Sequence, residues 1–231
     1  SDQTFIYTDR LGKRWVDEMR IGSPHNGWHA FTHFSDEICD YDHCPSWCVF
    51  DQTLFESGPM STRQGDWFEC GNFTTMLPDE LRDWEGWSGD NQAEVDKGWI
   101  IKADTLEELA AKMKAIDKWM DADTLKATVD TWNQVCENGE DPEFHRSAAT
   151  LNPLNNPPFY AYTVYPGSCS TLGGAMKNEH GQVLDPAENP IPRLYAAGCF
   201  GNFQSHSYGI TGGNNAENQV WGRIAARHAS G

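Results

Sequence analysis

The last forty residues, Pro192–Gly231, constrain the fold more than any other part of the chain. They predict a strand over Arg193–Ala197 that ends in small residues, and such strand ends let the backbone approach another group closely. A helix over about residues 214–230 follows, and Gly212 and Gly213 open it. Backbone N–H groups are free at such a helix start, where the positive end of the helix dipole favours negative charge. The alternative is a tight glycine turn that serves only packing.

Composition limits the classes of function. The chain has 231 residues, of which 39% are hydrophobic, and its 10 Trp and 11 Phe predict a packed core. The 34 acidic and 17 basic residues give a net charge of −17, which repels nucleic-acid phosphates and anionic membrane surfaces. The apolar runs are too short to cross a bilayer. We therefore expect no nucleic-acid partner and no membrane insertion.

Alternating apolar residues and turn signals predict further strands. The first two, Phe5–Thr8 and Lys13–Val16, form a hairpin around a turn at Asp9–Gly12. Ser46–Phe50 reads as a buried strand, and Asp51 is placed to cap the segment after it. The remaining predictions are strands at Trp99–Ala103 and Phe159–Tyr165 and a hairpin around Asn178–Gly181.

Two helices are predicted in the middle of the chain. Thr105 and Glu108 have the spacing of a capping box, and apolar residues recur behind them at helical intervals. A second helix begins near Asp123 or Thr124 and ends at Gly139, a left-handed C-cap signal. One face of it carries Leu125, Val129, Trp132 and Cys136.

Several segments together resemble one known family. The hairpin FIYTDRLGKRWVDE at the start, the helical unit from Trp99 to Arg146, and the ordered series PGSCSTLGG, PIPRLYAAG, SYGITGGNNA and GRIA all match it. The chain is similar to the C-terminal part of FAD-dependent oxidoreductases of the fumarate reductase/succinate dehydrogenase flavoprotein superfamily.

The resemblance implies an α/β fold, the C-terminal portion of a two-dinucleotide-type FAD domain with an inserted α+β capping domain. Residues 1–20 would be a hairpin of the FAD domain, 21–151 the capping domain and 152–231 the C-terminal segment of the FAD domain. The sequence contains no Gly-x-Gly-x-x-Gly, so the Gly-rich dinucleotide fold is expected in a missing N-terminal half. The residues that the resemblance places against FAD are Ser170, Gly198, Cys199, Gly213, Asn214, Asn215 and Ala216.

Three substitutions argue against a dicarboxylate substrate. Fumarate reductases bind the substrate carboxylate with a His where this chain has Cys169 and with an Arg where it has Ile210. Their proton-donating Arg corresponds to Phe55. Because a dicarboxylate needs paired cations to offset its desolvation, we exclude fumarate and succinate as substrates.

Tyr208 and Gly212 suggest a different chemistry. Their spacing resembles the Tyr-x-x-x-Gly of 3-ketosteroid dehydrogenases in the same superfamily. A phenol O–H and a glycine N–H on one substrate carbonyl would stabilise the enolate that hydride transfer forms. The alternative is a packing tyrosine at the entry of a helix.

The predicted function is therefore hydride transfer by a flavin-dependent reductase or dehydrogenase on a C–C bond conjugated to a carbonyl. Its partners would be FAD, a small-molecule substrate, the missing half and an electron donor that the sequence does not identify. One alternative is that this chain alone is inactive, without bound FAD, and self-associates through exposed apolar surface. Another is a cofactor-free binding module. The compartment stays open between the bacterial cytoplasm and the cell envelope.

Cysteines and histidines gather in the first half of the chain. The spacing of Cys39, Cys44, Cys48 and Cys70 fits zinc and iron–sulfur patterns poorly, so we expect core cysteines and no metal. A proton donor among His25, His29 and His33, or Arg63, is a minor alternative to surface or structural roles. Three tryptophans are predicted to form capping-domain core: Trp84, Trp87 and Trp99.

Overall fold

The computed structural model describes residues 4–21, 27–60, 88–166, 173–198 and 213–231. The chain forms two compact units, which we treat separately. Unit 1 comprises Ser1–Gly22 and His29–Pro166, and unit 2 comprises Ser23–Trp28 and Gly167–Gly231.

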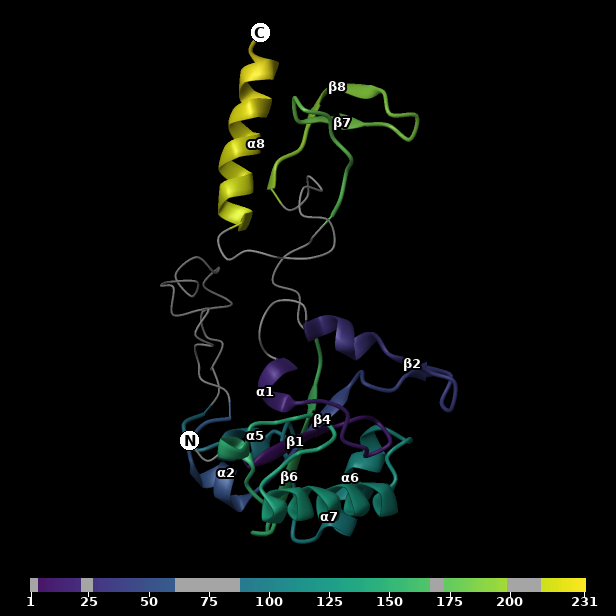
Figure 1. Cartoon of the computed structure of the whole chain (residues 1–231), viewed down its shortest axis with the longest axis vertical. Helices are drawn as coiled ribbons and strands as arrows, with labels where there is room; N and C mark the ends of the chain where they lie inside the picture. Colours follow the sequence, from purple (N-terminus) through teal and green to yellow (C-terminus); the bar gives the residue numbers. More distant parts are fainter. Residues whose placement is uncertain (1–3, 22–26, 61–87, 167–172, 199–212) are drawn as a thin grey trace. The chain divides into compact units, whose positions relative to one another are not determined.

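A four-stranded antiparallel sheet organises unit 1 (Figure 1). Its order is β1 (Phe5–Thr8), β4 (Ser46–Asp51), β6 (Phe159–Val164) and β5 (Ile101–Ala103). β4 pairs with strands on both sides and is buried along its whole length, as its run of apolar residues predicts. The predicted strands are confirmed here, with β5 starting two residues later than expected.

The predicted return strand Lys13–Val16 is not formed. Only an isolated bridge joins Thr8 to Arg14. The Asp9 carboxylate accepts hydrogen bonds from the N–H groups of Leu11 and Lys13, at 2.9 and 2.8 Å, and closes the turn locally. β1 instead forms its backbone hydrogen bonds with β4, and the chain continues into the short helix α1 (Glu18–Ile21).

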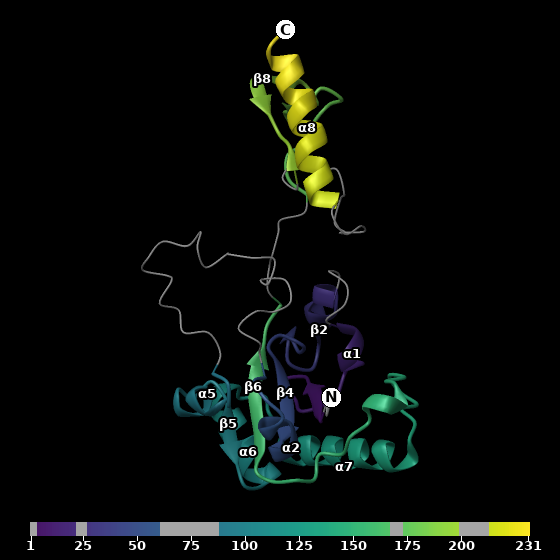
Figure 2. The same cartoon turned by 90° about the vertical axis from the view of Figure 1, so that its left-hand side faces the viewer.

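Helices α6 (Leu106–Ile116) and α7 (Ala122–Asn138) lie side by side on one face of this sheet (Figures 1 and 2). Thr105 caps α6 by accepting the Glu108 N–H at 3.1 Å, as predicted. α7 begins slightly before the predicted start because Asp121 accepts the Thr124 N–H at 2.9 Å. Between helices and sheet lies the main core, which includes Ile6, Trp47, Val49, Leu109, Met113, Leu125, Val129 and Trp132.

The opposite face of the sheet carries a second apolar cluster. Its buried members are Cys48, Phe50, Ile100 and Tyr160, and helices α2 (Gln52–Glu56) and α5 (Gln92–Asp96) contribute to it. Asp51 caps α2 as predicted, accepting the Thr53 N–H at 3.0 Å. Trp99 is not core, because 52% of it is exposed and its ring lies under the Lys97 ammonium. Trp84 and Trp87 fall outside the described residues.

Four buried charges join two segments of unit 1 that lie far apart in the sequence. The Arg14 guanidinium binds Glu18 and Asp141, each at 2.8 Å. Arg146 binds Glu18 at 3.0 Å and donates to the Phe5 carbonyl at 2.7 Å. This buried charge network therefore joins the N-terminal segment, from β1 to α1, to the chain that follows α7.

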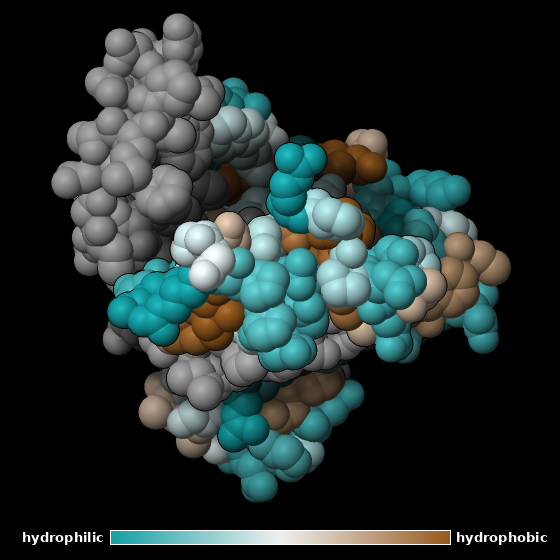
Figure 3. Space-filling view, turned by 90° about the horizontal axis from the view of Figure 1, so that it is seen from above, coloured by the Kyte–Doolittle hydropathy of each residue, from teal (hydrophilic) through white to brown (hydrophobic). Residues whose placement is uncertain are grey.

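The smaller elements of unit 1 are helix η2 (Ala148–Thr150), a two-stranded sheet and most of helix η1 (Gly27–Thr32), whose first two residues are grouped with unit 2. In that sheet β2 (Phe34–Ser35) pairs with β3 (Asp40–Tyr41), and Phe34 and Tyr41 are both about half exposed. Apolar patches lie among hydrophilic side chains on the surface that Figure 3 displays. No helix in the described ranges is long and apolar enough to cross a bilayer.

The described part of unit 2 contains a hairpin and a long helix. β7 (Gln182–Leu184) pairs with β8 (Pro190–Tyr195), and α8 spans Gly213–Ala229. The predicted turn before β7 is confirmed, since the Asn178 N–H donates to the Gln182 carbonyl at 3.0 Å. β8 starts earlier than predicted and ends at Tyr195, where Ala196 and Gly198 turn inward as buried residues.

The units do not decide the predicted domain boundaries. Unit 1 continues to Pro166 because β6 pairs with β4 and β5, whereas the sequence places a boundary after residue 151. Compactness shows which segments pack together, and it leaves open to which domain of a longer protein each strand belongs. The division into hairpin, capping domain and FAD segment stays a prediction.

Candidate functional site

The end of β8 approaches α8 closely in unit 2. Gly198 has φ +75°, and a Cβ at this position would collide with Asn218 Oδ1 from α8. The φ of Gly198 lies in the left-handed region that favours glycine, and the Asn218 side chain fills the space that a Cβ would take. The described group beside this strand end is thus a side chain of the last helix, and approach to a cofactor stays a prediction.

The first turn of α8 carries no acidic side chain and is open to a partner of negative charge. α8 has no acidic residue in this turn, and Asn215 and Ala216 are exposed. The first N–H groups of a helix have no acceptor within the helix, so they can bind a partner of negative charge. Gly213 and Asn214 open this turn.

Six predicted site residues lie outside the described residues. They are Cys169, Ser170, Cys199, Tyr208, Ile210 and Gly212. Of the residues predicted to contact FAD, the described ones are therefore Gly198 beside α8 and the first turn of α8 itself. The roles of all of these residues stay predictions.

Phe55 occupies the position where the resemblance expects a proton-donating Arg. It lies in α2, and its ring stacks on Tyr160 with centroids 4.3 Å apart and planes 8° apart. The position is therefore filled by an apolar side chain held in the second apolar cluster.

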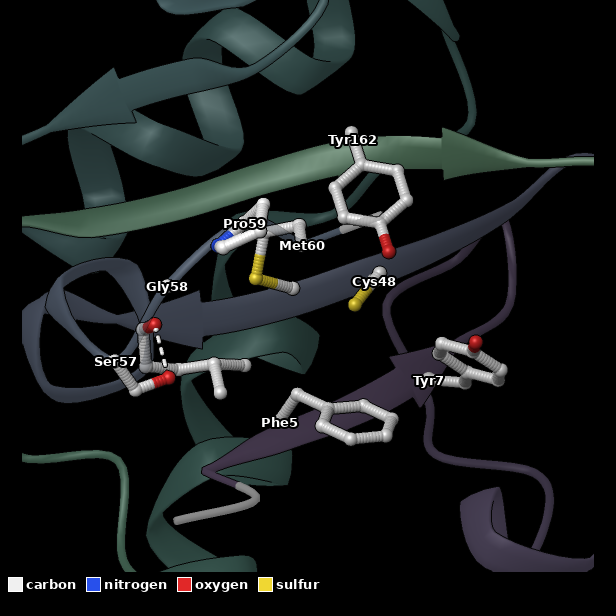
Figure 4. Close-up of a pocket in the computed structure, with 9 residues that line it drawn as sticks. Phe5, Tyr7, Cys48, Ser57, Gly58, Pro59, Met60 and Tyr162 are labelled. Carbon is white, nitrogen blue, oxygen red and sulfur yellow. Dashed lines mark hydrogen bonds between the residues drawn. The ribbon is translucent and has the colours of Figure 1, made fainter. Parts of the chain in front are cut away.

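Unit 1 has a pocket of about 200 Å³ beside these residues (Figure 4). Its floor comes from three neighbouring strands, because the register pairs Cys48 with both Tyr7 and Tyr162 on one face of the sheet. Alternation along β1 brings Phe5 to the same face. The remaining wall comes from α2 and the residues after it, namely Leu54, Ser57, Gly58, Pro59 and Met60.

The polar groups of this sheet pocket stay uncharged at neutral pH. Burial raises the pKa of Cys48 to about 12, although a hydrogen bond with Tyr162 opposes the shift. Burial is also the main cause of the raised pKa of Tyr7 and of Tyr162. Two phenols and a thiol among apolar walls can hydrogen bond a neutral carbonyl or phenol, but they offer no charge to a carboxylate.

Sequence reasoning missed this pocket. The available signal was the two-residue alternation Phe5-x-Tyr7 and Tyr160-x-Tyr162, which places aromatic side chains on one face of each strand. The alternation does not reveal that the two strands flank Cys48. That arrangement depends on pairing across more than a hundred residues.

The described cysteines do not assemble a metal site. Cys39 is exposed whereas Cys48 is buried in the sheet, so their thiols lie in different environments. Cys70 lies outside the described residues. Among described side chains, the group that could hold a metal ion is His33, Asp42 and His43. His25 and Arg63 are not described, nor is the side chain of His29.

Comparison with known proteins identifies the family. The FAD binding domain family matches residues 5–215, which is most of the chain. The chain belongs to this family of FAD-binding domains. The α/β fold class predicted above is confirmed, as is membership in a family of FAD-dependent oxidoreductases.

Individual relatives match more than half of this chain, whereas the chain covers less than half of each of them. A vinyl phenol reductase of Lactiplantibacillus plantarum is 32% identical over 240 residues, 99% of this chain and 43% of the relative. A 3-oxosteroid 1-dehydrogenase of Mycobacterium tuberculosis is 31% identical over 150 residues, 58% of this chain and 26% of the relative. The chain thus spans less than half the length of these curated relatives.

A solved structure shares the fold. The 3-ketosteroid delta1-dehydrogenase from Sterolibacterium denitrificans, in complex with 1,4-androstadiene-3,17-dione, superposes with a TM-score of 0.66 at 24% identity. The match covers 98% of this chain and 38% of the dehydrogenase.

Proposed function

We propose that the complete protein is an FAD-dependent reductase or dehydrogenase acting on a C–C bond conjugated to a neutral carbonyl. The observation that carries the proposal is Phe55, which is packed on Tyr160 where a fumarate reductase would need a cationic proton donor. Cys169 and Ile210 replace two further residues that would bind a dicarboxylate. Fumarate and succinate are therefore not its substrates.

The residues of this chain have distinct roles in that proposal. Bound FAD supplies or accepts the hydride. The first turn of α8, from Gly213 to Ala216, would direct its N–H groups at the flavin, with Ser170, Gly198 and Cys199 beside it. The Tyr208 hydroxyl and the Gly212 N–H would donate to the substrate carbonyl and stabilise the developing enolate. Cys169 and Ile210 would line the substrate.

A second candidate substrate has its double bond conjugated to a phenol. The relative that matches 99% of this chain is named a vinyl phenol reductase. The name of the Mycobacterium tuberculosis relative instead refers to an oxosteroid, which carries a carbonyl. Both classes are neutral, so the replacement of the carboxylate-binding His and Arg by Cys169 and Ile210 fits each of them.

The test uses the longer protein with its N-terminal half. We expect turnover of a 3-oxosteroid or another conjugated ketone and none of fumarate. Replacing Tyr208→Phe should lower kcat by roughly 10²-fold, the usual effect of losing one oxyanion donor. A matched control is Tyr41→Phe, since Tyr41 is an exposed residue of β3. Unchanged kcat and KM in the Tyr208 variant would exclude its role, and turnover of vinyl phenols alone would favour the second candidate.

A spectrum tests the requirement for a missing half. We propose that this chain binds FAD only together with an N-terminal dinucleotide fold, which would also cover apolar surface that otherwise favours self-association. The purified chain should show no flavin absorbance near 450 nm, whereas the chain with that half should be yellow. Stoichiometric FAD on the chain alone would contradict this proposal.

A further inference from the structure

Three side chains with metal-binding atoms meet at one end of the two-stranded sheet in unit 1. His33 precedes β2, and Asp42 and His43 directly follow β3. His33 Nδ1 lies 2.7 Å from Asp42 Oδ1, and His43 Nε2 lies 3.7 Å from the same oxygen. All three ligand atoms lie within 4.8 Å of one another.

The backbone holds this His–Asp–His group in place. The Asp42 N–H donates to the His33 carbonyl at 3.3 Å, and the Asp42 carbonyl accepts the Arg10 N–H at 2.9 Å. Asp42 is only 6% exposed, so its carboxylate is largely removed from water. A buried carboxylate requires a positive or hydrogen-bonding partner, and in the described part of the chain this carboxylate meets the two histidines.

His43 is oriented as a metal ligand would be. Its Nδ1 lies 2.8 Å from the Ala30 carbonyl and, in the neutral ring, donates its proton there. The Nε2 lone pair then faces the Asp42 carboxylate. Trp15 stacks on the imidazole with centroids 4.1 Å apart, which fixes the ring plane. A backbone carbonyl behind one ring nitrogen is the usual outer support of a metal-binding histidine.

Two electron-pair acceptors that face each other repel unless a positive charge lies between them. The third ligand is adaptable, since the His33 side chain is 59% exposed; its ring stacks on His43 with centroids 4.8 Å apart and would turn away from that ring to bind the ion. This geometry therefore favours a bound cation.

We propose that His33, Asp42 and His43 bind one divalent transition-metal ion of the zinc class. Two imidazoles and one carboxylate suit zinc, cobalt or nickel, whereas magnesium and calcium prefer oxygen ligands. Ligands about 2.0–2.1 Å from zinc can be no more than about 4.2 Å apart, so the group must close by a fraction of an ångström. Rotation of His33 provides that movement, and water fills the remaining coordination.

The ion would join the end of η1 to the end of β3. It would thereby fix the arm formed by β2 and β3, whose own hydrogen-bonded ladder spans only two residue pairs. This site uses no residue assigned to flavin or substrate. Its test is therefore independent of the proposed function.

The test titrates zinc chloride into the chelator-treated full chain by calorimetry, with magnesium chloride as the parallel titrant. We expect one zinc per chain and no heat from magnesium. Replacing the exposed ligand, His33→Gln, should weaken zinc binding at least about tenfold without affecting the fold, and His43→Ala should do so as well. Cobalt chloride should give visible absorption bands in the parent chain that both variants lose.

A matched control is His180→Ala in unit 2. His180 Nε2 lies 3.5 Å from the Glu179 carboxylate and its ring stacks on His228, but these residues are not among the described groups that could hold a metal ion. This variant should bind zinc like the parent chain. The proposal is overturned if the parent shows no saturable zinc binding, or if the His33 and His43 variants keep the parent affinity, which would place the ion elsewhere.

Discussion

The two units differ in how much core they enclose. Unit 1 buries large apolar side chains on both faces of its sheet, among them Trp47, Phe50 and Trp132. In the described part of unit 2, the buried apolar residues are Val183 and Ala196, and Val220 on α8 is 54% exposed. A helix of this length is rarely stable without an apolar face to bury. We infer that unit 1 is the stable part of this chain and that α8 needs further protein surface.

The units also differ in how they treat buried charge. Unit 1 surrounds Arg14, Glu18, Asp141 and Arg146 with mutual salt bridges and backbone acceptors. In unit 2, Lys177 Nζ lies 3.8 Å from Glu217, and neither Lys177 Nζ nor Glu217 Oε1 has a hydrogen-bond partner among the described residues. Buried ions stabilise a fold only where geometry and hydrogen bonds offset their desolvation. We therefore expect the buried salt bridges of unit 1 to stabilise the fold and the Lys177–Glu217 pair of unit 2 to destabilise it.

The largest expected effect is the loss of the shared carboxylate in unit 1. Replacing Glu18→Gln leaves Arg14 and Arg146 with one acid fewer and weakens the acceptor of the Tyr7 N–H. We expect the free energy of unfolding to fall by about 3–5 kcal/mol, the usual consequence of uncompensated buried charge. Urea unfolding followed by tryptophan fluorescence measures it.

Glu37→Gln is the control for this experiment. Glu37 lies 3.6 Å from Lys13 with 64% of its side chain exposed, so its replacement should change stability by less than about 1 kcal/mol. Equal effects of the two substitutions would show that the buried charge network does not stabilise the contact between the N-terminal segment and the chain that follows α7.

A smaller effect is expected when an apolar side chain of α7 in unit 1 is compared with one of α8 in unit 2. Leu125 on α7 is fully buried in unit 1, and Leu125→Ala should lower the free energy of unfolding by about 2–5 kcal/mol. Val220→Ala on α8 should change it by no more than about 0.5 kcal/mol, because the side chain is mostly exposed. Thermal and urea unfolding of the two variants compare the units directly. A large loss from Val220→Ala would show that α8 already has its covering surface in this chain.

Local signals predict local structure well. Residue type and spacing alone indicate Thr105, Asp51 and Gly139 as caps, and each caps its helix in the structure. Capping depends on atoms only a few residues apart, which a sequence displays directly. The prediction of a return strand at Lys13–Val16 is wrong because β1 pairs with the distant strand β4 and not with the residues that follow its own turn.

Contacts between distant segments could not be predicted. The sequence shows Arg14 and Glu18 in one family motif and Asp141 and Arg146 in another, but nothing in it shows that the four side chains meet. The cysteine spacing from Cys39 to Cys48 led us to expect no metal, and it gives no sign that Asp42 and His43 meet His33. Proximity across a turn and a strand pair decides such a site, and spacing alone does not encode it.

The smallest expected effect concerns the charge pair of unit 2. The double replacement Lys177→Met with Glu217→Leu removes both charges and keeps most of the buried volume beside Trp221. We expect unchanged or slightly higher stability, since apolar residues often replace a poorly hydrogen-bonded buried pair without loss. Lys177→Met alone should stabilise less than the double replacement, because it removes the disfavoured amine but leaves the Glu217 carboxylate buried without its cation. Hydrogen exchange of the α8 amides measures both variants in the full chain.

The pH dependence of α8 protection shows whether the Lys177 charge stabilises or destabilises unit 2. Burial lowers the pKa of Lys177 below its ordinary value of 10.5. At pH values below the lowered pKa the folded state holds a charged amine that burial disfavours, and this penalty is relieved as the pH rises toward 10.5. Protection of α8 should therefore increase with pH in that alkaline window, after correction for intrinsic exchange, and the double variant should lose the increase. Protection that falls with pH in the parent chain would mean that the Lys177 charge stabilises unit 2, through Glu217 and the Trp221 ring that it overlies at 3.9 Å.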